Sequence, residues 1–248
     1  MITYKKSIRL IALLVLMVGL LSGCSTRSIS NSDYSADPDR GYAQRNNPFY
    51  KGELNEFDVI GIDAKASISE QEIAQAAQSK TRLTVSKGAT IMLIQSGAMI
   101  PDEEMVKGME KYYNVSVFTG VPTADGSSGG AYSRALRLAA AKAGAEKLIV
   151  YWGFLETGRE DLATKAVSWF PFVGGTIADE TQRMRIRMKV AVVDVKSGQG
   201  ELFSPEPYED SASSGRYSRA SSDQAQVATL KNKAYKAAAD DLVKRYSK

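Results

Sequence analysis

The chain has 248 residues, with 32 Lys and Arg against 28 Asp and Glu and a formal net charge of +4. It contains one cysteine and no histidine. These counts exclude an internal disulfide, Ser-His-Asp and Cys-His catalysis, and zinc sites with histidine ligands, because each needs residues that the chain lacks. Carboxylate, Ser-Lys or tyrosine chemistry remains available, as does a function in binding alone.

The first 23 residues are typical of a secretory signal. Three basic residues, Lys5, Lys6 and Arg9, precede an uncharged apolar run at 10–21, which is shorter than the roughly 20 residues of a transmembrane helix. Without this segment the chain has 32 less 3, or 29, basic residues against 28 acidic ones. A basic domain is the expected footprint of nucleic-acid binding, so this near-neutral balance predicts no nucleic-acid partner.

The stretch Leu21-Ser22-Gly23-Cys24 follows the apolar run directly and resembles the bacterial lipobox. The resemblance implies cleavage after Gly23, diacylglycerol on the Cys24 sulfur and an acyl chain on the new amino terminus. Two or more such chains hold a protein stably on a membrane. Ser25 differs from the aspartate that retains enterobacterial lipoproteins at the inner membrane, so the resemblance implies an outer-membrane lipoprotein that faces the periplasm. An ordinary secretory signal that ends near a free cysteine is the alternative.

Residues 24–55 are rich in Ser, Asn, Asp and Arg and contain few aliphatic side chains. Such a segment buries too little apolar surface to offset the entropy of ordering, so we expect a flexible tether. The alternative is an arm that packs along the domain through Tyr42, Phe49 and Tyr50. Residues 56–248 are predicted to form a single α/β domain in the periplasm.

Strands and helices are expected to alternate in the first part of this domain, which predicts βα units and a partly parallel sheet. Ser69 and Glu72 have the spacing of a helix capping box, and Pro101 suits the first turn of a helix. The neighbouring acids Asp102, Glu103 and Glu104 are interpreted as groups that complement the helix dipole. The expected strands are 57–63, 90–95, 114–121 and 146–156, and the expected helices are 67–80, 101–113 and 131–145.

The second part of the domain is predicted to contain a long β-hairpin and a final helix in place of alternating strands and helices. Residues 181–208 read as a long strand, a turn at Ser197-Gly198 and a returning strand, followed by a Ser-rich loop at 209–222. A last helix at 223–246 has an apolar face made of Val227, Leu230, Ala234, Ala238, Leu242 and Tyr246. The predicted fold class is therefore α/β with α+β character at the C-terminal end: a mixed sheet of βα units plus a long β-hairpin, packed by about four helices.

The hairpin "VVDVKSGQGELF" resembles an element of the envelope α/β lipoproteins that include the curli-secretion and TolB amino-terminal-domain class. The resemblance implies a domain that scaffolds envelope machinery or, in one branch, a subunit of a secretion pore. It transfers no functional residue to this chain.

A basic stripe is the clearest candidate site. Four cations alternate with apolar residues, which puts the cations on one face of a strand. They suit an anionic partner such as lipid headgroups, a wall polymer or an acidic protein patch. The alternative is a solvated face that is compensated by Glu201 or other acids on neighbouring strands. The stripe consists of Arg183, Arg185, Arg187 and Lys189.

An aromatic segment at 166–178 is the second candidate, with Trp169, Phe170 and Phe172 as its contact residues. One interpretation is an exposed loop that contacts a membrane or a partner, and another is a segment that caps the core. A membrane-inserted hairpin is the third, although the segment lacks the alternation of barrel strands.

Together these observations predict a non-enzymatic outer-membrane lipoprotein that binds an envelope protein or a wall polymer, without cofactor or metal. A homo-oligomer is compatible with this function. The alternatives are a periplasmic hydrolase that uses carboxylates or a Ser-Lys pair, and a subunit of a secretion channel.

Overall fold

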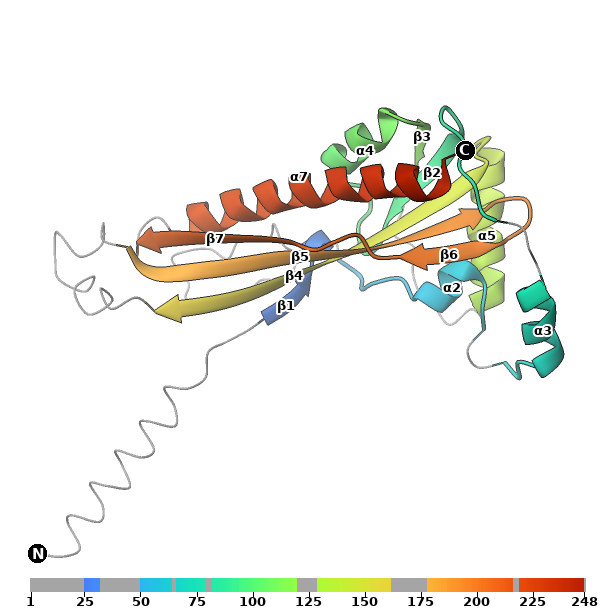
Figure 1. The fold of residues 1–248 in the computed structure, drawn as a ribbon, viewed down its shortest axis with the longest axis horizontal. Coiled ribbons are helices and arrows are strands. Elements are labelled where there is room, and N and C mark those ends of the chain that lie inside the picture. The colour runs from blue at the N-terminus through green and yellow to red at the C-terminus, as the bar shows by residue number, and fades with distance from the viewer. Residues whose placement is uncertain are drawn as a thin grey trace, which may run out of the picture.

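The computed structural model describes residues 25–31, 50–63, 66–78, 82–119, 129–161, 178–215 and 219–247. In this part of the chain seven strands form one mixed sheet, and helices lie on both of its faces, as Figure 1 shows. The predicted α/β class is confirmed. The strands are β1 (Ser25–Ser28), β2 (Thr90–Gln95), β3 (Asn114–Val117), β4 (Lys147–Asp161), β5 (Ala178–Asp194), β6 (Gly200–Phe203) and β7 (Tyr208–Gly215). The helices are α2 (Glu56–Ile60), α3 (Glu70–Gln78), α4 (Glu103–Glu110), α5 (Gly129–Lys142) and α7 (Arg219–Tyr246), and a 3-10 turn, η1, covers Ile29–Asn31.

Two long antiparallel strands, β4 and β5, pair along their full length. The sheet has two halves along this ladder, because different strands flank β4 and β5 at its two ends. In the inner half the order is β3-β2-β4-β5-β6, with β2 parallel to both β3 and β4. In the outer half β1 pairs with β4 and β7 pairs with β5, and every pairing is antiparallel. We define the inner half of the β4–β5 ladder as 147–153 with 188–194, and the outer half as 154–161 with 178–187.

The long helix α7 covers one face of the sheet over both halves (Figure 1) and packs on β5, β7 and α4. Its predicted apolar face is confirmed, because all six expected residues are buried in the main hydrophobic cluster. Met184, Ile186 and Met188 of β5 point to the same side and join this cluster. The alternation in β5 therefore directs its apolar residues toward α7.

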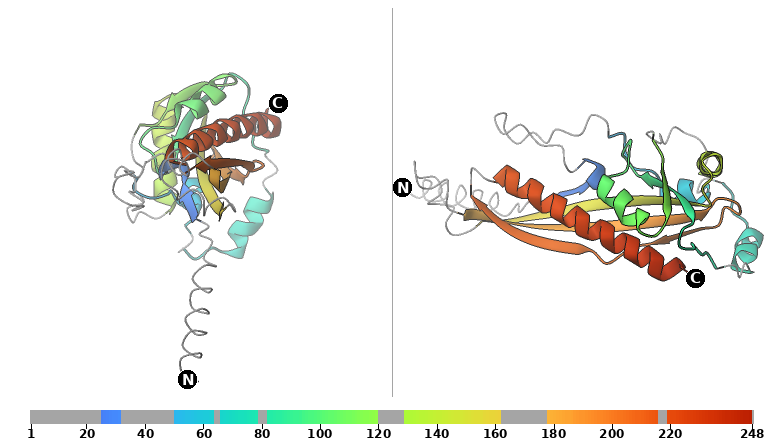
Figure 2. Two further views of the ribbon diagram at one scale, coloured as in Figure 1. Left: turned by 90° about the vertical axis from the view of Figure 1, so that its left-hand side faces the viewer. Right: turned by 90° about the horizontal axis from the view of Figure 1, so that it is seen from above.

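The opposite face is covered by α2 and α5 in the inner half, where a second cluster contains Leu148, Val150 and Trp152. The indole Nε1 of Trp152 donates a hydrogen bond to the carbonyl of Leu54 at 2.8 Å, which satisfies the one polar atom of this buried ring. In the outer half no helix among the described elements lies over this face. The right-hand view in Figure 2 shows the outer ribbon extending beyond the helices of the inner half, with α7 lying across the sheet.

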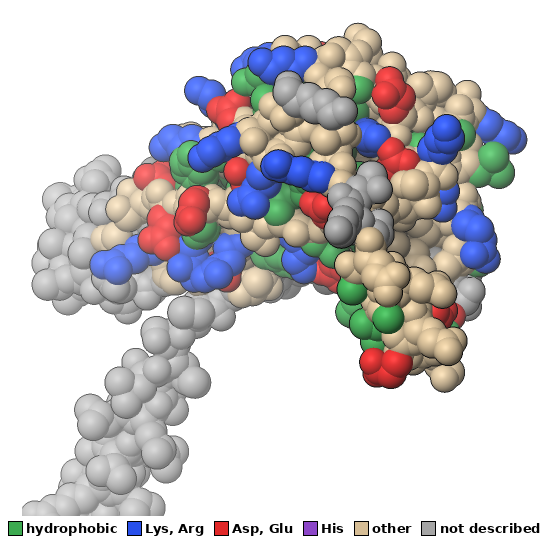
Figure 3. Space-filling model, turned by 45° about the vertical axis from the view of Figure 1, so that its right-hand side comes forward, with side chains coloured by type: hydrophobic (Ala, Val, Ile, Leu, Met, Phe, Trp, Pro, Cys, Tyr) green, Lys and Arg blue, Asp and Glu red, His purple; other side chains and the backbone are tan. Residues whose placement is uncertain are grey.

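All four predicted helices are present, as α3, α4, α5 and α7. The capping box of α3 is confirmed, since the Ser69 amide donates to Glu72 Oε2 at 2.8 Å and the Glu72 amide donates to Ser69 Oγ at 3.2 Å. Helix α3 itself buries no residue, and Figure 3 shows its exposed apolar side chains in green at the lower right. None of the helices among the described residues is long and apolar enough to span a membrane.

The strand predicted at 57–63 is wrong, because these residues form helix α2 and the turn after it. The side chain of Asn55 accepts a hydrogen bond from the Phe57 amide at 2.8 Å, and Gly61 ends the helix in the left-handed conformation at φ 82°. A short apolar run fits either a strand or a buried helix, and these two capping residues decide between them.

The Ser-rich loop predicted at 209–222 is also wrong. Residues 208–215 form edge strand β7, and α7 begins at Arg219. Gly is depleted in strands, and the segment is rich in Ser, but the long strand β5 offers these residues backbone partners from Ala178 to Ile186, with one irregularity between Ala178 and Glu180. The tertiary partner overrides the local preference.

The described parts of the expected tether are packed on the sheet, which corrects that expectation for residues 25–31 and 50–55. Ser25–Ser28 pair with β4, and Ile29 is 1% exposed within the main cluster. Gly153 makes room for it, since a Cβ at that position would lie 2.3 Å from Ile29 Cδ1. One buried isoleucine and four residues paired with β4 therefore fix the arm to the sheet, although its polar composition predicted a flexible tether.

Candidate functional site

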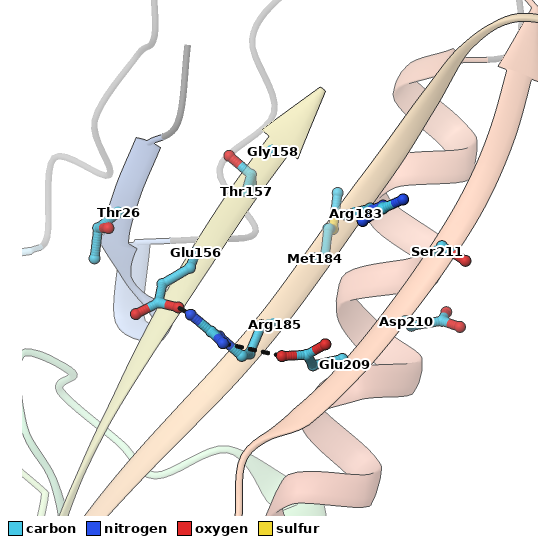
Figure 4. Close-up of a pocket in the computed structure, with 10 residues that line it drawn as sticks. All are labelled: Thr26, Glu156, Thr157, Gly158, Arg183, Met184, Arg185, Glu209, Asp210 and Ser211. Carbon is cyan, nitrogen blue, oxygen red and sulfur yellow. Dashed lines mark hydrogen bonds and ion pairs between the residues drawn. The ribbon is translucent and has the colours of Figure 1, made fainter. Parts of the chain in front are cut away.

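The face of the outer half that no described helix covers, called the uncovered face from here on, carries an open hollow of about 760 Å³. Its lining residues come from β1, β4, β5 and β7, and Figure 4 shows α7 behind these strands. Most of its lining residues are polar or charged, so the hollow offers hydrogen bonds and ion pairs beside apolar contact. The lining residues are Thr26, Glu156, Thr157, Gly158, Arg183, Met184, Arg185, Glu209, Asp210 and Ser211.

Arg185 lies at the centre of this face and bridges two carboxylates from the flanking strands (Figure 4). Its Nε donates to Glu156 Oε2 at 2.6 Å, and its Nη1 donates to Glu209 Oε1 at 3.0 Å. The register explains the arrangement, because Arg185 stands opposite Glu156 in β4 and opposite Glu209 in β7. Residues directly opposite in a ladder share a face, so the two carboxylates can bind the guanidinium from both sides.

The other cations of the stripe continue along the same face. Arg187 Nε lies 3.0 Å from the second oxygen of Glu156, so one carboxylate binds two arginines. Lys189 pairs with Glu56 of α2, and its Nζ lies 5.9 Å from the centre of the Phe154 ring. Arg183 lines the hollow and is exposed.

The alternation predicted for the stripe is therefore present, and the partners come from neighbouring elements, as the compensated-face interpretation describes. Glu201 is not among them. It stands opposite Val192 in the ladder, which places it on the α7 face, and its carboxylate accepts a hydrogen bond from Tyr246. Figure 3 likewise shows blue and red side chains interspersed over the drawn face rather than in separate fields.

The carboxylate of Glu156 is held in its ionised form. Burial raises its pKa, but the hydrogen bond and charge of Arg185, together with Arg187, lower the pKa more, so it lies below its usual value. Conversely, hydrogen bonds from the guanidinium to Glu156 and Glu209 raise the pKa of Arg185. A general acid needs a raised pKa near the working pH, so this carboxylate is poorly suited to donate a proton. It is suited to hold two cations in fixed positions.

A second polar cluster lies on the α7 side, at the start of α4. Lys231 is buried, and its Nζ lies 3.1 Å from Asp102 Oδ2; the hydroxyl of Tyr235 donates to the same carboxylate oxygen. Asp102 occupies the N-cap position of α4, but its side chain makes no cap hydrogen bond. The carboxylate instead ties α4 to α7.

The same cluster continues into the sheet. The Tyr151 hydroxyl donates to Gln95 Oε1 at 2.5 Å, and the Asp102 amide donates to that oxygen at 2.7 Å. Burial raises the pKa of Tyr151 well above its ordinary value, so the phenol stays protonated. Gln95 Nε2 in turn donates to Ser30 Oγ at 3.0 Å. These bonds connect strands, helices and the N-terminal arm, which is a structural role.

Several predicted site residues lie outside the described residues: Cys24, Trp169, Phe170 and Phe172. The described part of the chain contains no group of three or more acidic, Cys or His side chains that could hold a metal ion. Sequence reasoning missed Glu156 and Glu209 as members of the site. Alternation from Trp152 along β4 could have placed Glu156 on the second face, but the pairing with Arg185 depends on strand register.

The fold and the site define an α/β protein with a charged sheet face that no described helix covers and that the N-terminal strand β1 borders at one edge. The family model of the YafT bacterial lipoprotein matches residues 55–245, well over half of the chain. The chain therefore belongs to the YafT bacterial lipoprotein family, which makes it a membrane-anchored protein of the bacterial envelope. The match begins after Cys24, so the acylation of this residue stays a prediction, as does the resemblance to the curli-secretion and TolB class. Among curated proteins, none matches the sequence.

Proposed function

We propose that this lipoprotein is acylated at Cys24, faces the periplasm from the outer membrane and works without catalysis, by binding an envelope partner. The binding surface is the uncovered face of the outer half of the sheet. The observation that carries the proposal is the difference in cover: α7 packs on one face of the outer ribbon, while the hollow opens on the other. An uncovered antiparallel sheet face has room for a partner that the helix-covered inner half lacks.

The chemistry of the hollow supports a partner with charged groups of both signs. Glu156 and Glu209 flank Arg185 across the lining strands, and Arg183 follows on the same face of β5, so an extended polar segment meets both donors and acceptors. Such complementary charges give specificity and orientation more than raw affinity. The depressed pKa of Glu156 favours this use over acid catalysis.

The anchor is tested by replacing Cys24 with Ser in cells and separating soluble from membrane fractions. We expect Cys24→Ser to move the protein into the soluble fraction, while the control variant Thr26→Ser stays with the membrane. Continued membrane association of Cys24→Ser would overturn acylation at this site. Separation of inner from outer membranes on a density gradient then tests the outer-membrane assignment.

The partner surface is tested with a photo-crosslinking amino acid placed in intact cells at Thr26 and Ser211, on opposite sides of the hollow. Lys142, an exposed residue at the end of α5, is the matched control. We expect a discrete crosslinked species from the two hollow positions and not from Lys142. A species at the mass of two chains identifies a second copy as the partner, and equal labelling from all three positions contradicts the proposed surface.

Charge reversal supplies an independent test of the same surface. Arg185→Glu combined with Arg187→Glu places four carboxylates where two cations had balanced two, so we expect the crosslinked species to disappear. Reversal of Lys107, an exposed lysine on α4, should leave it intact. An unchanged crosslink in the Arg185 and Arg187 variant would mean that the stripe is a solvated face only.

A further inference from the structure

The first residue after Cys24 already belongs to the sheet. Strand β1 begins at Ser25, which stands opposite Thr157 of β4. Consecutive Cα atoms are about 3.8 Å apart, so Cys24 lies within one residue of the ladder. An anchor on Cys24 is therefore joined to the folded sheet directly, with no intervening length of flexible chain.

The described arm is fixed to the sheet along its whole length. Its four strand residues pair with β4, Ile29 is buried beside Gly153, and the Ser30 hydroxyl donates to the carbonyl of Ser96 at 2.6 Å. Ser30 Oγ also accepts a hydrogen bond from the side-chain amide of Gln95. These contacts hold the direction of β1 relative to the rest of the sheet.

That direction points the anchor at the outer end of the ribbon. Because β1 is antiparallel to β4, its first residue lies toward the outer tip and its last residue, Ser28, lies toward the inner half opposite Phe154. Figure 1 shows β1 beside the outer part of β4, on the edge of the sheet away from β7. Lys147, at the other end of β4, is ten residues from Thr157, or about 33 Å along the strand.

The geometry points to one membrane orientation: we propose that the outer end of the ribbon rests on the lipid bilayer surface along its β1 edge, with the β5–β6 turn farthest from the membrane. This inference rests on the proposed acylation of Cys24. The headgroup layer of a leaflet is about 5–8 Å thick, so acyl chains on Cys24 bring Ser25 to the outer boundary of that layer. The hollow is then held next to the membrane, where it meets partners that are themselves at the surface.

The length of the ribbon sets its inclination. Strand β4 continues four residues beyond Thr157, to Asp161, which is about 13 Å and more than the headgroup layer. An upright ribbon would carry the charged residues 159–161 into the hydrocarbon, where charges are costly. The ribbon therefore lies inclined to the membrane plane, with β1 toward the lipid and β7 away from it.

A single introduced cysteine tests this orientation, since the one native cysteine is occupied by lipid when the anchor forms. Ser211→Cys marks the outer half, and Lys196→Cys marks the β5–β6 turn; both positions are exposed. The purified lipidated full chain, labelled with a donor fluorophore, is placed on phosphatidylethanolamine and phosphatidylglycerol vesicles that contain an acceptor lipid. We expect several-fold more energy transfer from position 211 than from position 196. Equal transfer, or more from position 196, overturns the proposal.

A linker variant separates this inference from the anchor itself. Insertion of a long Gly-Ser segment between Cys24 and Ser25 keeps the acylation site and frees the domain, so the difference between the two labels should vanish while the protein still floats with the vesicles. A difference that survives the linker would show that the anchor does not set the orientation. Failure of the unextended protein to float would overturn the acylation of Cys24 and the orientation together.

Discussion

The inner and outer halves of the β4–β5 ladder are made by the same two strands but differ in cover. In the inner half, residues 148–152 and 190–193 are all buried, because α7 lies on one face and α2 and α5 lie on the other. In the outer half, burial alternates: Met184 and Ile186 face α7, while Arg185 and Arg187 lie on the opposite face of the sheet. A continuous apolar run marks a strand covered on both sides, and alternation marks one covered on a single side.

This difference in cover implies that the two halves contribute differently to stability and to binding. The inner half holds the fold together through buried apolar area, and the outer half presents ion pairs that contribute little to stability. Substitutions of comparable size in the two halves should therefore have unequal effects on the free energy of unfolding. The four variants below test that contrast, from the largest expected effect to the smallest.

Replacement of Trp152 by Ala should have the largest effect. The indole is 1% exposed and hydrogen-bonded to Leu54, so its removal leaves a cavity and an unpaired carbonyl, with an expected loss of about 3–5 kcal/mol. Phe154→Ala is the matched control two residues along the same face, where the ring is only partly buried. Urea denaturation followed by circular dichroism measures both. Equal losses would contradict the division at residue 153.

Replacement of Gly153 by Val should detach the N-terminal arm. Its Cβ would lie 2.3 Å from Ile29 Cδ1 and 2.9 Å from Ile29 Cγ2, so the isoleucine has to leave its site. We expect a loss of about 1.5–3 kcal/mol, the value of one buried aliphatic side chain. Amide hydrogen exchange should also become faster in residues 25–31.

Gly158→Val is the matched control for this variant. Gly158 lies in the same strand, and a Cβ there meets nothing within 4 Å. A β-branched residue suits a strand, so we expect this variant to be neutral or slightly stabilised. Unchanged exchange of the arm in Gly153→Val would mean that Ile29 does not hold β1 in place.

Much of the fold could be predicted from the sequence because its strongest patterns are local. The apolar runs of β2 and β4, the alternation in β5 and the helical stripe of α7 each indicate their element without knowledge of a neighbour. The short or polar elements could not be predicted in this way. Strand β7 depends on β5 for its partners, and α2 depends on two capping residues around a run that also suits a strand.

Of the candidate site, only the residues that lie in β5 could be predicted from the sequence. The period-2 pattern identifies the four cations and the face they share, but their acids lie on β4, β7 and α2, far apart in the sequence. The partners follow from strand register, which the hydrophobic pattern of β5 alone does not fix. The pairing of Asp102 with Lys231 has the same origin, since it joins two helices separated by five strands in the chain.

A pH test probes the inner end of the β4–β5 ladder, where Asp194 stands opposite Lys147. Burial raises its pKa, but hydrogen bonds from Lys147 and Ser197 outweigh burial and lower the pKa to about 2. A carboxylate with a depressed pKa stabilises the fold above its unfolded pKa, and this stabilisation is lost as the pH falls from about 4 to about 2. Solvent screens the pair, so Asp194→Asn should lose about 1 kcal/mol at pH 7 and almost nothing at pH 2. A pH-independent difference would contradict this assignment.

Replacement of Glu156 by Gln should have the smallest effect on stability, although this carboxylate binds two arginines. Arg185 and Arg187 are substantially exposed, and water replaces the lost ion pairs, so the urea midpoint should stay within error of the parent chain. The variant changes the hollow instead, because it leaves the cations without their shared counter-charge and increases attraction to anionic groups. We therefore expect crosslinks from Ser211 to change in strength or partner while the fold is unaltered. A loss of stability similar to that of Trp152→Ala would show that the ion pairs of the outer half hold the fold, and that the two halves do the same work.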